Sequence, residues 1–226
     1  MLLRRRYRTL LAVGVVLVVV KIYIYFSYKS FAYYTNQAWN PVVKCYNTKQ
    51  HLQQLVDLTH DVHHILNKMD VEHWLIYGSI WGAKRVEGPL PWDNDVDIGF
   101  SGESYSFSSR TLDEFLKPFE DSGMVVRNKW RQSGTITISK PNLPLSLDLF
   151  AFYEHNGWKK RTGLEPWLFF LNYDYYHTFP SWTVEPPLPQ VRFGHFNISI
   201  PKGEFTALKY LYRDNWWTEV KPKGCL

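Results

Sequence analysis

Three aspartates at alternate positions, Asp93, Asp95 and Asp97, constrain the fold of this 226-residue chain more than any other feature. Alternate side chains of an extended strand point to one face, so Asp95 and Asp97 would project together while Val96 and Ile98 enter a core. Carboxylates held side by side repel one another unless a positive charge lies between them. Because hard divalent cations prefer oxygen ligands, the run predicts a strand that binds Mg²⁺ or Mn²⁺, and with it phosphoryl chemistry.

A glycine–serine pair upstream of the acidic run is a candidate phosphate site. Gly78 and Ser79 follow a short apolar segment, and a glycine there lets a ligand approach the backbone closely. We expect Ser79 to cap a short helix over residues 80–85, whose first N–H groups would bind donor phosphates. Lys84 and Arg85 could reach nucleotide phosphates as well, or they could lie on a solvated helix face.

A lone carboxylate in an apolar strand provides a third acid. Asp148 lies within the apolar segment 145–151, where burying an unpaired charge is costly. If this strand neighbours the acidic strand, Asp148 completes a three-carboxylate site that binds metal or accepts the proton of an attacking hydroxyl. A salt bridge to an arginine or lysine is the alternative. Trp92, beside the acids, and Lys202, before the last expected helix, are further candidates for substrate binding.

The N-terminal segment differs from the rest of the chain. Leu10 to Phe26 is a run of 17 residues that is apolar except for Lys21, at the short end of a membrane span. Four arginines precede it, so the positive-inside rule places the N-terminus in the cytosol and the remainder in the lumen. A cleavable signal peptide is the alternative, but it would need small residues where this chain has tyrosines and lysines. We therefore expect a single-pass type II protein with a cytosolic tail (1–9), a transmembrane signal anchor (10–27), a stem (28–47) and a lumenal catalytic domain (48–226).

Composition and cysteine use fit such a location. The net charge is +5, partly from the N-terminal arginines, so the folded part is only mildly basic and a nucleic-acid partner is not indicated. Cys45 and Cys225 are the only cysteines; in an oxidising lumen they could pair, or they could remain free thiols. Asn197 opens a sequon for N-linked glycosylation. Aromatic residues make up 17% of the chain, which is consistent with core packing or with grooves that hold sugar or base rings.

Hydrophobic periodicity predicts an α+β or mixed α/β domain with the acidic strand in a central position. Apolar residues recur at helical spacing in three segments, and turn residues separate several short apolar runs. We expect helices over 49–69, 112–119 and 204–212, a hairpin from 124–130 and 135–139, and further strands over 73–77, 146–153 and 191–200.

The motifs around the acids resemble those of the LicD family, which includes bacterial phosphocholine transferases, fukutin and fukutin-related protein. The resemblance is carried by residues 74–85 and 91–99, continues at 147–150, and returns at 200–202 and 212–216. It implies a nucleotidyltransferase fold of the DNA polymerase β type. It also implies transfer of a phospho-alcohol group, such as phosphocholine or ribitol phosphate, from a CDP-activated donor to a glycan on a glycoprotein or glycolipid.

The resemblance also implies roles for individual residues and a Golgi or ER membrane location. Asp95 and Asp97 would bind Mg²⁺ or Mn²⁺ with Asp93 beside them, Asp148 would be the third acid, and Gly78 and Ser79 would line the donor phosphates. Two alternatives stay open. A nucleotide-sugar glycosyltransferase could use its Asp-x-Asp for Mn²⁺, although such enzymes usually carry a longer nucleotide-binding unit before that motif. A catalytically inactive accessory protein of glycosylation could keep the fold, although the intact acids argue against it.

Overall fold

The computed structural model describes residues 2–35 and 45–219, with side chains described for 6–24 and 45–219. The chain divides into two compact units, Met1–Pro41 and Val42–Leu226. The first contains the helix α1 (Leu2–Thr35). Within it, Arg6–Ile24 is long and apolar enough to cross a membrane, a test that a signal sequence also passes. The transmembrane anchor therefore stays a prediction, and residues 36–44 of the expected stem lie outside the described residues.

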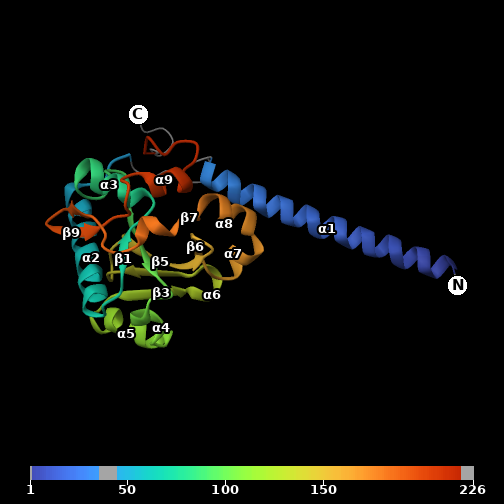
Figure 1. The fold of residues 1–226 in the computed structure, drawn as a ribbon, viewed down its shortest axis with the longest axis horizontal. Helices are drawn as coiled ribbons and strands as arrows, with labels where there is room; N and C mark the ends of the chain where they lie inside the picture. The colour runs from blue at the N-terminus through green and yellow to red at the C-terminus, as the bar shows by residue number, and fades with distance from the viewer. Residues whose placement is uncertain (1, 36–44, 220–226) are drawn as a thin grey trace. The chain divides into compact units, whose positions relative to one another are not determined.

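A mixed sheet forms the centre of the second unit, with seven strands among the described residues (Figure 1). Its main path runs through β1 (His73–Leu75), β2 (Asp95–Ser101), β5 (Ser146–His155), β4 (Thr135–Ser139) and β3 (Val125–Lys129). From β5 the sheet continues into β6 (Trp158–Arg161) and β7 (Phe179–Pro180). The pairing of β2 with β5 is parallel and all other pairings are antiparallel. The mixed α/β class expected from the sequence is confirmed.

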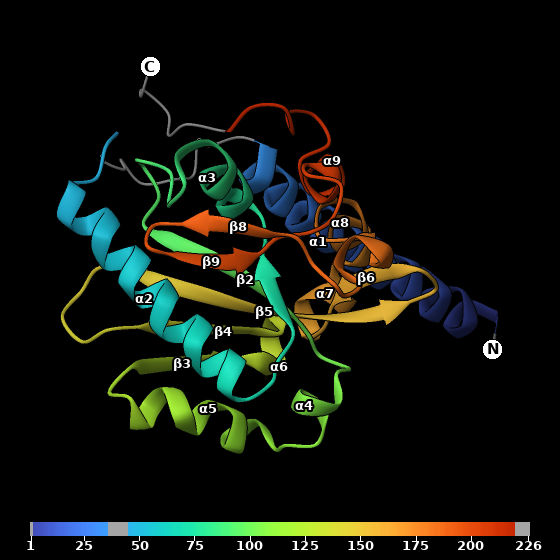
Figure 2. The ribbon, with the colours of Figure 1, turned by 60° about the vertical axis from the view of Figure 1, so that its left-hand side comes forward.

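Two helices and a hairpin cover one face of this sheet. Figure 2 shows α2 (Lys49–Lys68) across the strands and α5 (Leu112–Asp121) beside β3. Both helices place apolar side chains in the same core, which is why their helical periodicity was readable in the sequence. The hairpin of β8 (Gln190–Phe193) and β9 (Phe196–Ser199) packs closely on α2. Gly194 at its turn has a φ of +63°, and a Cβ there would lie 2.3 Å from Val56, so this turn requires glycine.

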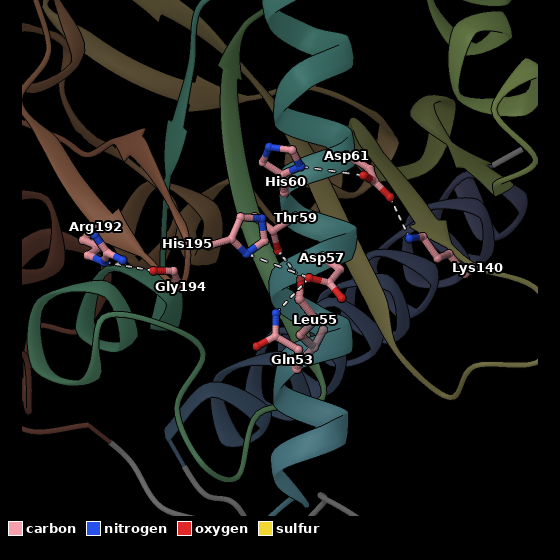
Figure 3. Close-up of polar contacts among 10 residues, drawn as sticks. All are labelled: Gln53, Leu55, Asp57, Thr59, His60, Asp61, Lys140, Arg192, Gly194 and His195. Atoms are coloured by element: carbon pink, nitrogen blue, oxygen red, sulfur yellow. Dashed lines mark hydrogen bonds and ion pairs between the residues drawn. The ribbon is translucent and has the colours of Figure 1, made fainter.

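Polar contacts tie the outer side of α2 to its neighbours (Figure 3). Asp61 forms an ion pair with Lys140 at 2.6 Å, and Asp57 lies 4.0 Å from the imidazole of His195 in the hairpin turn. Inside the helix, the buried hydroxyl of Thr59 donates to the carbonyl oxygen of Leu55 at 2.7 Å. Asp57 and Asp61, called the α2 carboxylates below, are thus half-exposed and each faces a basic side chain.

The opposite face of the sheet carries a second core of mostly aromatic residues. It includes Trp74, Phe150, Phe152 and Phe179, which pack against the C-terminal part of the chain. The elements in that part are α7 (Leu164–Leu168), α8 (Phe170–Tyr176), the 3₁₀ helix η2 (Ser181–Val184) and α9 (Thr206–Leu211). The aromatic stretch over 167–182 has no clear hydrophobic period, and it folds into short helices and the strand β7 beside this core.

Most expected elements are confirmed to within a few residues. The helices over 49–69, 112–119 and 204–212 and the hairpins at 124–139 and 191–200 are present. The single-turn helices α4 (Tyr105–Ser108) and α6 (Trp130–Ser133) were not expected. One expectation is wrong: α3 (Gly78–Val86) begins before Ser79, with Tyr77 at the N-cap position and no side-chain cap. Ser79 lies inside the helix, and its hydroxyl accepts a hydrogen bond from the backbone N–H of Asp97 instead of capping α3.

Candidate active site

Parallel pairing of β2 with β5 brings three carboxylates together. Asp97 is the register partner of Asp148, and Asp95 is the partner of Ser146. Paired residues project to the same face of a sheet, so Asp148 joins the face that Asp95 and Asp97 share. One oxygen from each of these three carboxylates lies within 4.8 Å of the others. We call Asp95, Asp97 and Asp148 the acid cluster, and it could hold a metal ion.

Electrostatic repulsion in the acid cluster is strong. Burial raises the pKa of Asp97 well above its usual range, and the nearby charges of Asp95 and Asp148 raise it further. Burial, followed by the charge of Asp148, raises the pKa of Asp95 to about 6, although part of the Asp95 side chain still contacts solvent. The Oδ1 atom of Asp148 is buried and has no hydrogen-bond partner among the described residues. An all-oxygen cluster with this excess of negative charge fits a hard divalent cation.

Asp93 lies beside the cluster, at the start of α3. A Cβ on Gly78 would be 3.8 Å from the Oδ2 of Asp93, so this carboxylate is close to the first residue of the helix. Burial raises the pKa of Asp93 to about 7, with a further contribution from the charge of Asp95. Asn47 donates from Nδ2 to the backbone oxygen of Asp93 at 2.6 Å and holds this segment in place. Because the Asp93 carboxylate lies near Gly78, the positive end of the α3 dipole is close to a negatively charged group.

Ser79 connects α3 to the acidic strand. Its buried Oγ accepts a hydrogen bond of 2.9 Å from the backbone N–H of Asp97. This bond fixes the start of β2 relative to the helix, so Ser79 acts on the backbone of an acid-bearing residue. Tyr77, just before α3, has a φ of 51° and a ψ of −135°, a combination that costs free energy for any residue with a Cβ. Its hydroxyl lies 2.8 Å from Nδ1 of the buried His177.

The sequence analysis missed two residues near the acids. The guanidinium group of Arg161 lies 4.4 Å from the ring centroid of Phe150 and is close enough to Asp97 to lower the pKa of that carboxyl. Burial, followed by the charge of Asp97, raises the pKa of Tyr212 well above its usual range. A signal for Arg161 was present: Asn-Gly at 156–157 is typical of a two-residue hairpin turn, which sets the register of β6 against β5.

The structure does not bring every expected substrate-binding residue to the acids. Lys84 forms an ion pair with Glu204 at 3.6 Å, and Arg85 forms one with Glu219 and donates to the carbonyl oxygen of Trp217. Both lie in the last turn of α3, roughly 9 Å along the helix axis from its first residue. Their expected contact with donor phosphates is therefore not supported, because their charges face the C-terminal segment.

Four other expectations on individual residues have different outcomes. Trp92 is buried in the core at 8% exposure and supports the turn before β2 from inside, so no open stacking surface exists there. Lys202 is half-buried before α9, and its backbone N–H donates to the carbonyl oxygen of Thr183 at 2.6 Å. Asn197 is exposed on β9, and its glycosylation stays a prediction. Cys45 is disulfide-bonded, whereas Cys225, its expected partner, lies outside the described residues.

Comparison with known families identifies the class of protein. The family described as LicD/FKTN/FKRP, nucleotidyltransferase domain, matches residues 70–203, which contain the acid cluster, α3 and Arg161. Since this match spans more than half of the chain, the chain belongs to the LicD family.

Individual relatives are distant. An uncharacterised protein of Rickettsia prowazekii is 35% identical over 72 residues, which cover 32% of this chain and 26% of that protein. Human ribitol-5-phosphate transferase FKTN is 24% identical over 164 residues, covering 69% of this chain and 32% of that protein. The chain thus spans about a third or less of the length of these relatives. Among solved structures, ANT(2″)-Ia in complex with adenylyl-2″-tobramycin is similar, with a TM-score of 0.44, 14% identity, and coverage of 70% of this chain and 75% of that one.

Proposed function

We propose that this protein transfers a phospho-alcohol group, of the phosphocholine or ribitol-phosphate type, from a CDP-activated donor to a hydroxyl of a glycan on a glycoprotein or glycolipid. Membership of the LicD family supports a transferase acting on phosphate groups, and the relative named as a ribitol-5-phosphate transferase supports the transferred group. The observation that carries the proposal is the acid cluster, formed by two parallel strands and adjacent to the N-terminus of α3.

Each carboxylate has a role that follows from its position. Asp95 and Asp97 are the metal ligands, with Asp93 beside them, and Mg²⁺ or Mn²⁺ bound there would neutralise the charge that develops on the phosphate oxygens. Asp148 has a buried oxygen without a hydrogen-bond partner among the described residues, so it either completes the metal site or accepts the proton of the attacking hydroxyl. Ser79 keeps Asp97 in position through the backbone.

The reaction is a displacement at the phosphorus nearer the alcohol group. The oxygen of the acceptor hydroxyl forms a bond to that phosphorus, its proton passes to a carboxylate, and the bond from phosphorus to the CMP oxygen breaks. The first N–H groups of α3, at Gly78 and Ser79, have the position and polarity to bind phosphate oxygens of the donor. Because the groups are held in place, positioning and electrostatic stabilisation supply much of the rate.

The cellular location is part of the proposal. The apolar segment Arg6–Ile24 would anchor the protein as a single-pass type II protein of the Golgi or ER membrane, with the catalytic domain in the lumen. A lumenal environment is consistent with the disulfide at Cys45 and would allow glycosylation of the exposed Asn197.

A thermal-shift panel tests the activity class. CDP-choline, CDP-ribitol, CDP-glycerol and UDP-sugars are added to the full chain with and without Mn²⁺, and the transition temperature is measured. We expect a CDP-alcohol to raise the transition temperature only when Mn²⁺ is present, because a ligand that binds the native state stabilises it. Stabilisation by UDP-sugars alone would favour a glycosyltransferase. A folded protein that responds to neither metal nor donor would favour an accessory protein.

A further inference from the structure

A second candidate site lies away from the acid cluster. A cavity of about 560 Å³ opens between the β5–β6 hairpin and the helices α7 and α8. Its volume falls in the range of small-molecule binding sites, and none of the carboxylates of the acid cluster lines it. It is lined by both strands of the hairpin, by the loop after β6 and by one side of each helix.

Aromatic side chains at the mouth of this cavity are unusually exposed. Trp167 is 73% exposed and Phe170 is 51% exposed, while Tyr173 forms a buried part of the wall. An aromatic face carries partial negative charge and attracts weakly positive C–H groups. One face of a pyranose ring presents such C–H groups, and its hydroxyls point outward to polar side chains. Exposed aromatic rings around a cavity with a polar lining therefore suit a sugar.

Basic and acidic side chains are mixed in the lining. Lys160 forms an ion pair with Asp174 at 2.7 Å, and Nη2 of Arg161 donates to the carbonyl oxygen of Ser133 at 2.8 Å. Glu154 adds a second carboxylate to the lining. Carboxylates repel the diphosphate of a nucleotide donor but accept hydrogen bonds from sugar hydroxyls. The lining thus favours a neutral, hydroxyl-rich ligand over a nucleotide.

One residue connects this cavity with the acid cluster. Arg161 lines the cavity, and its guanidinium group lies 4.4 Å from the ring centroid of Phe150, which is two residues from Asp148 on the same face of β5. We propose that the cavity binds the acceptor saccharide, with Trp167 and Phe170 stacking on a sugar ring and the chain of sugars continuing past Arg161 toward the acids. This inference rests on the proposed transfer to a glycan and adds the place where the glycan binds.

Ligand-observed NMR on the full chain tests the binding site directly. Saturation transfer and Kd values are measured for methyl glycosides of glucose, galactose, mannose, N-acetylglucosamine and N-acetylgalactosamine, and for their linear trisaccharides. We expect at least one to bind, and the double variant Trp167→Ala, Phe170→Ala to weaken that binding about tenfold. The matched control is Trp182→Ala, which removes a tryptophan that is 48% exposed but lies outside the cavity lining.

The outcomes separate this inference from the proposed function. If no saccharide binds the wild-type protein, or if the double variant binds as tightly as Trp182→Ala, the cavity is not an acceptor site. Binding of vesicles or of a second copy of the chain at Trp167, without saccharide binding, also overturns the inference. Stabilisation by CDP-alcohol and Mn²⁺ would persist in each of these cases and would leave the proposed function standing.

Release of CMP from a CDP-alcohol provides a second measurement. The release of CMP to water is measured without saccharide for the wild type, the double variant and Trp182→Ala, and it gives the baseline for each protein. A trisaccharide that binds the wild-type protein should accelerate this release, and the acceleration should be lost in the double variant. Equal acceleration in both proteins would contradict the proposed position of the acceptor.

Discussion

Asp57 and Asp61 on α2 and Asp95 and Asp97 on β2 are two pairs of carboxylates whose spacing places each pair on one face of its element. The fold gives them opposite surroundings. Each α2 carboxylate is half-exposed and faces a basic side chain, Lys140 or His195. The carboxylates on β2 instead lie with a third acid, Asp148; Asp95 is exposed, and Asp97 and Asp148 are half-buried. Partial burial and the neighbouring carboxylate charges raise the pKa values of Asp95 and Asp97.

The difference between the two regions shows which carboxylates could hold a metal ion. On α2, Asp61 is paired with Lys140, and Asp57 lies 4.0 Å from the imidazole of His195. In the acid cluster Arg161 offsets only part of the charge on Asp97, and the remaining repulsion among three acids fits a bound cation. Four experiments test this contrast between the α2 carboxylates and the acid cluster.

The largest effect is expected from Asp97→Asn. Loss of one metal-binding carboxylate should reduce transfer from a CDP-alcohol by a factor of about 10³ or more, because charge stabilisation in the transition state is lost. The protein should still fold, since removing one of three repelling charges relieves strain in the metal-free form. Asp61→Asn on α2 is the matched control and should leave transfer rates unchanged. Comparable rates for the two variants would contradict the metal role of the acid cluster.

The second effect concerns pH. The raised pKa values of Asp93 and Asp95 mean that the folded state favours the protonated carboxyls. Their contribution to the stability of the metal-free protein is therefore fully present below pH 4. It is lost as the pH rises through about 6 for Asp95 and about 7 for Asp93. Thermal unfolding at pH 4 to 8, with EDTA or with Mn²⁺, measures this. Mn²⁺ at 100 times its Kd should restore about 2.7 kcal/mol at pH 7 and almost nothing at pH 4. If the stability of the metal-free protein instead rises between pH 5 and pH 7, the pKa values of Asp93 and Asp95 are not raised in the folded state.

A smaller effect on activity is expected from Ser79→Ala. The change leaves the backbone N–H of Asp97 without the acceptor that holds it, so we expect a loss of about 1–3 kcal/mol in stability and roughly tenfold slower transfer. Thr59→Val on α2 removes a buried hydroxyl of similar environment, which donates to Leu55. It should cost about 1 kcal/mol in stability with no change in transfer rate. Equal losses of activity in both variants would mean that Ser79 acts only through stability.

The smallest effect is expected from Lys140→Ala, which breaks the ion pair with Asp61. Exposed ion pairs contribute about 0–1 kcal/mol, and this one is half-exposed. Chemical denaturation in low and high salt should show a small loss that disappears in high salt. Transfer rates should match the wild type. A loss above 2 kcal/mol would mean that the α2 carboxylates depend on their partners more than their exposure indicates.

The sequence predicted those parts of the fold that local patterns encode. Helical periodicity over 49–69 located α2, and alternate acids located β2, because each pattern reflects burial of one face. The acid cluster forms because Asp148 lies in register with Asp97. From the sequence, Asp148 was expected to join the site only if its strand neighbours the acidic strand, and local patterns do not determine which strands pair. Ser79 was misjudged as a cap, since its partner is a backbone N–H 18 positions away in sequence. The partners of Lys84 and Arg85 in the C-terminal segment could not be predicted, because only tertiary packing brings Glu204 and Glu219 close to them.

The length of β5 sets a distance that the substrate has to match. The strand begins at Ser146, carries Asp148 near its start, and reaches the cavity lining at Tyr153. Five residues of extended strand separate Asp148 from Tyr153, or roughly 17 Å. Arg161, which lies over Phe150, marks the end of the cavity lining nearer to the acids, and Tyr153 marks the farther end. In the proposed acceptor site, a monosaccharide held at the farther end would bind without reaching the phosphorus. Under the proposed function, the protein would select acceptors by length as well as by chemistry, and a glycan too short to span the strand would act as a competitive inhibitor.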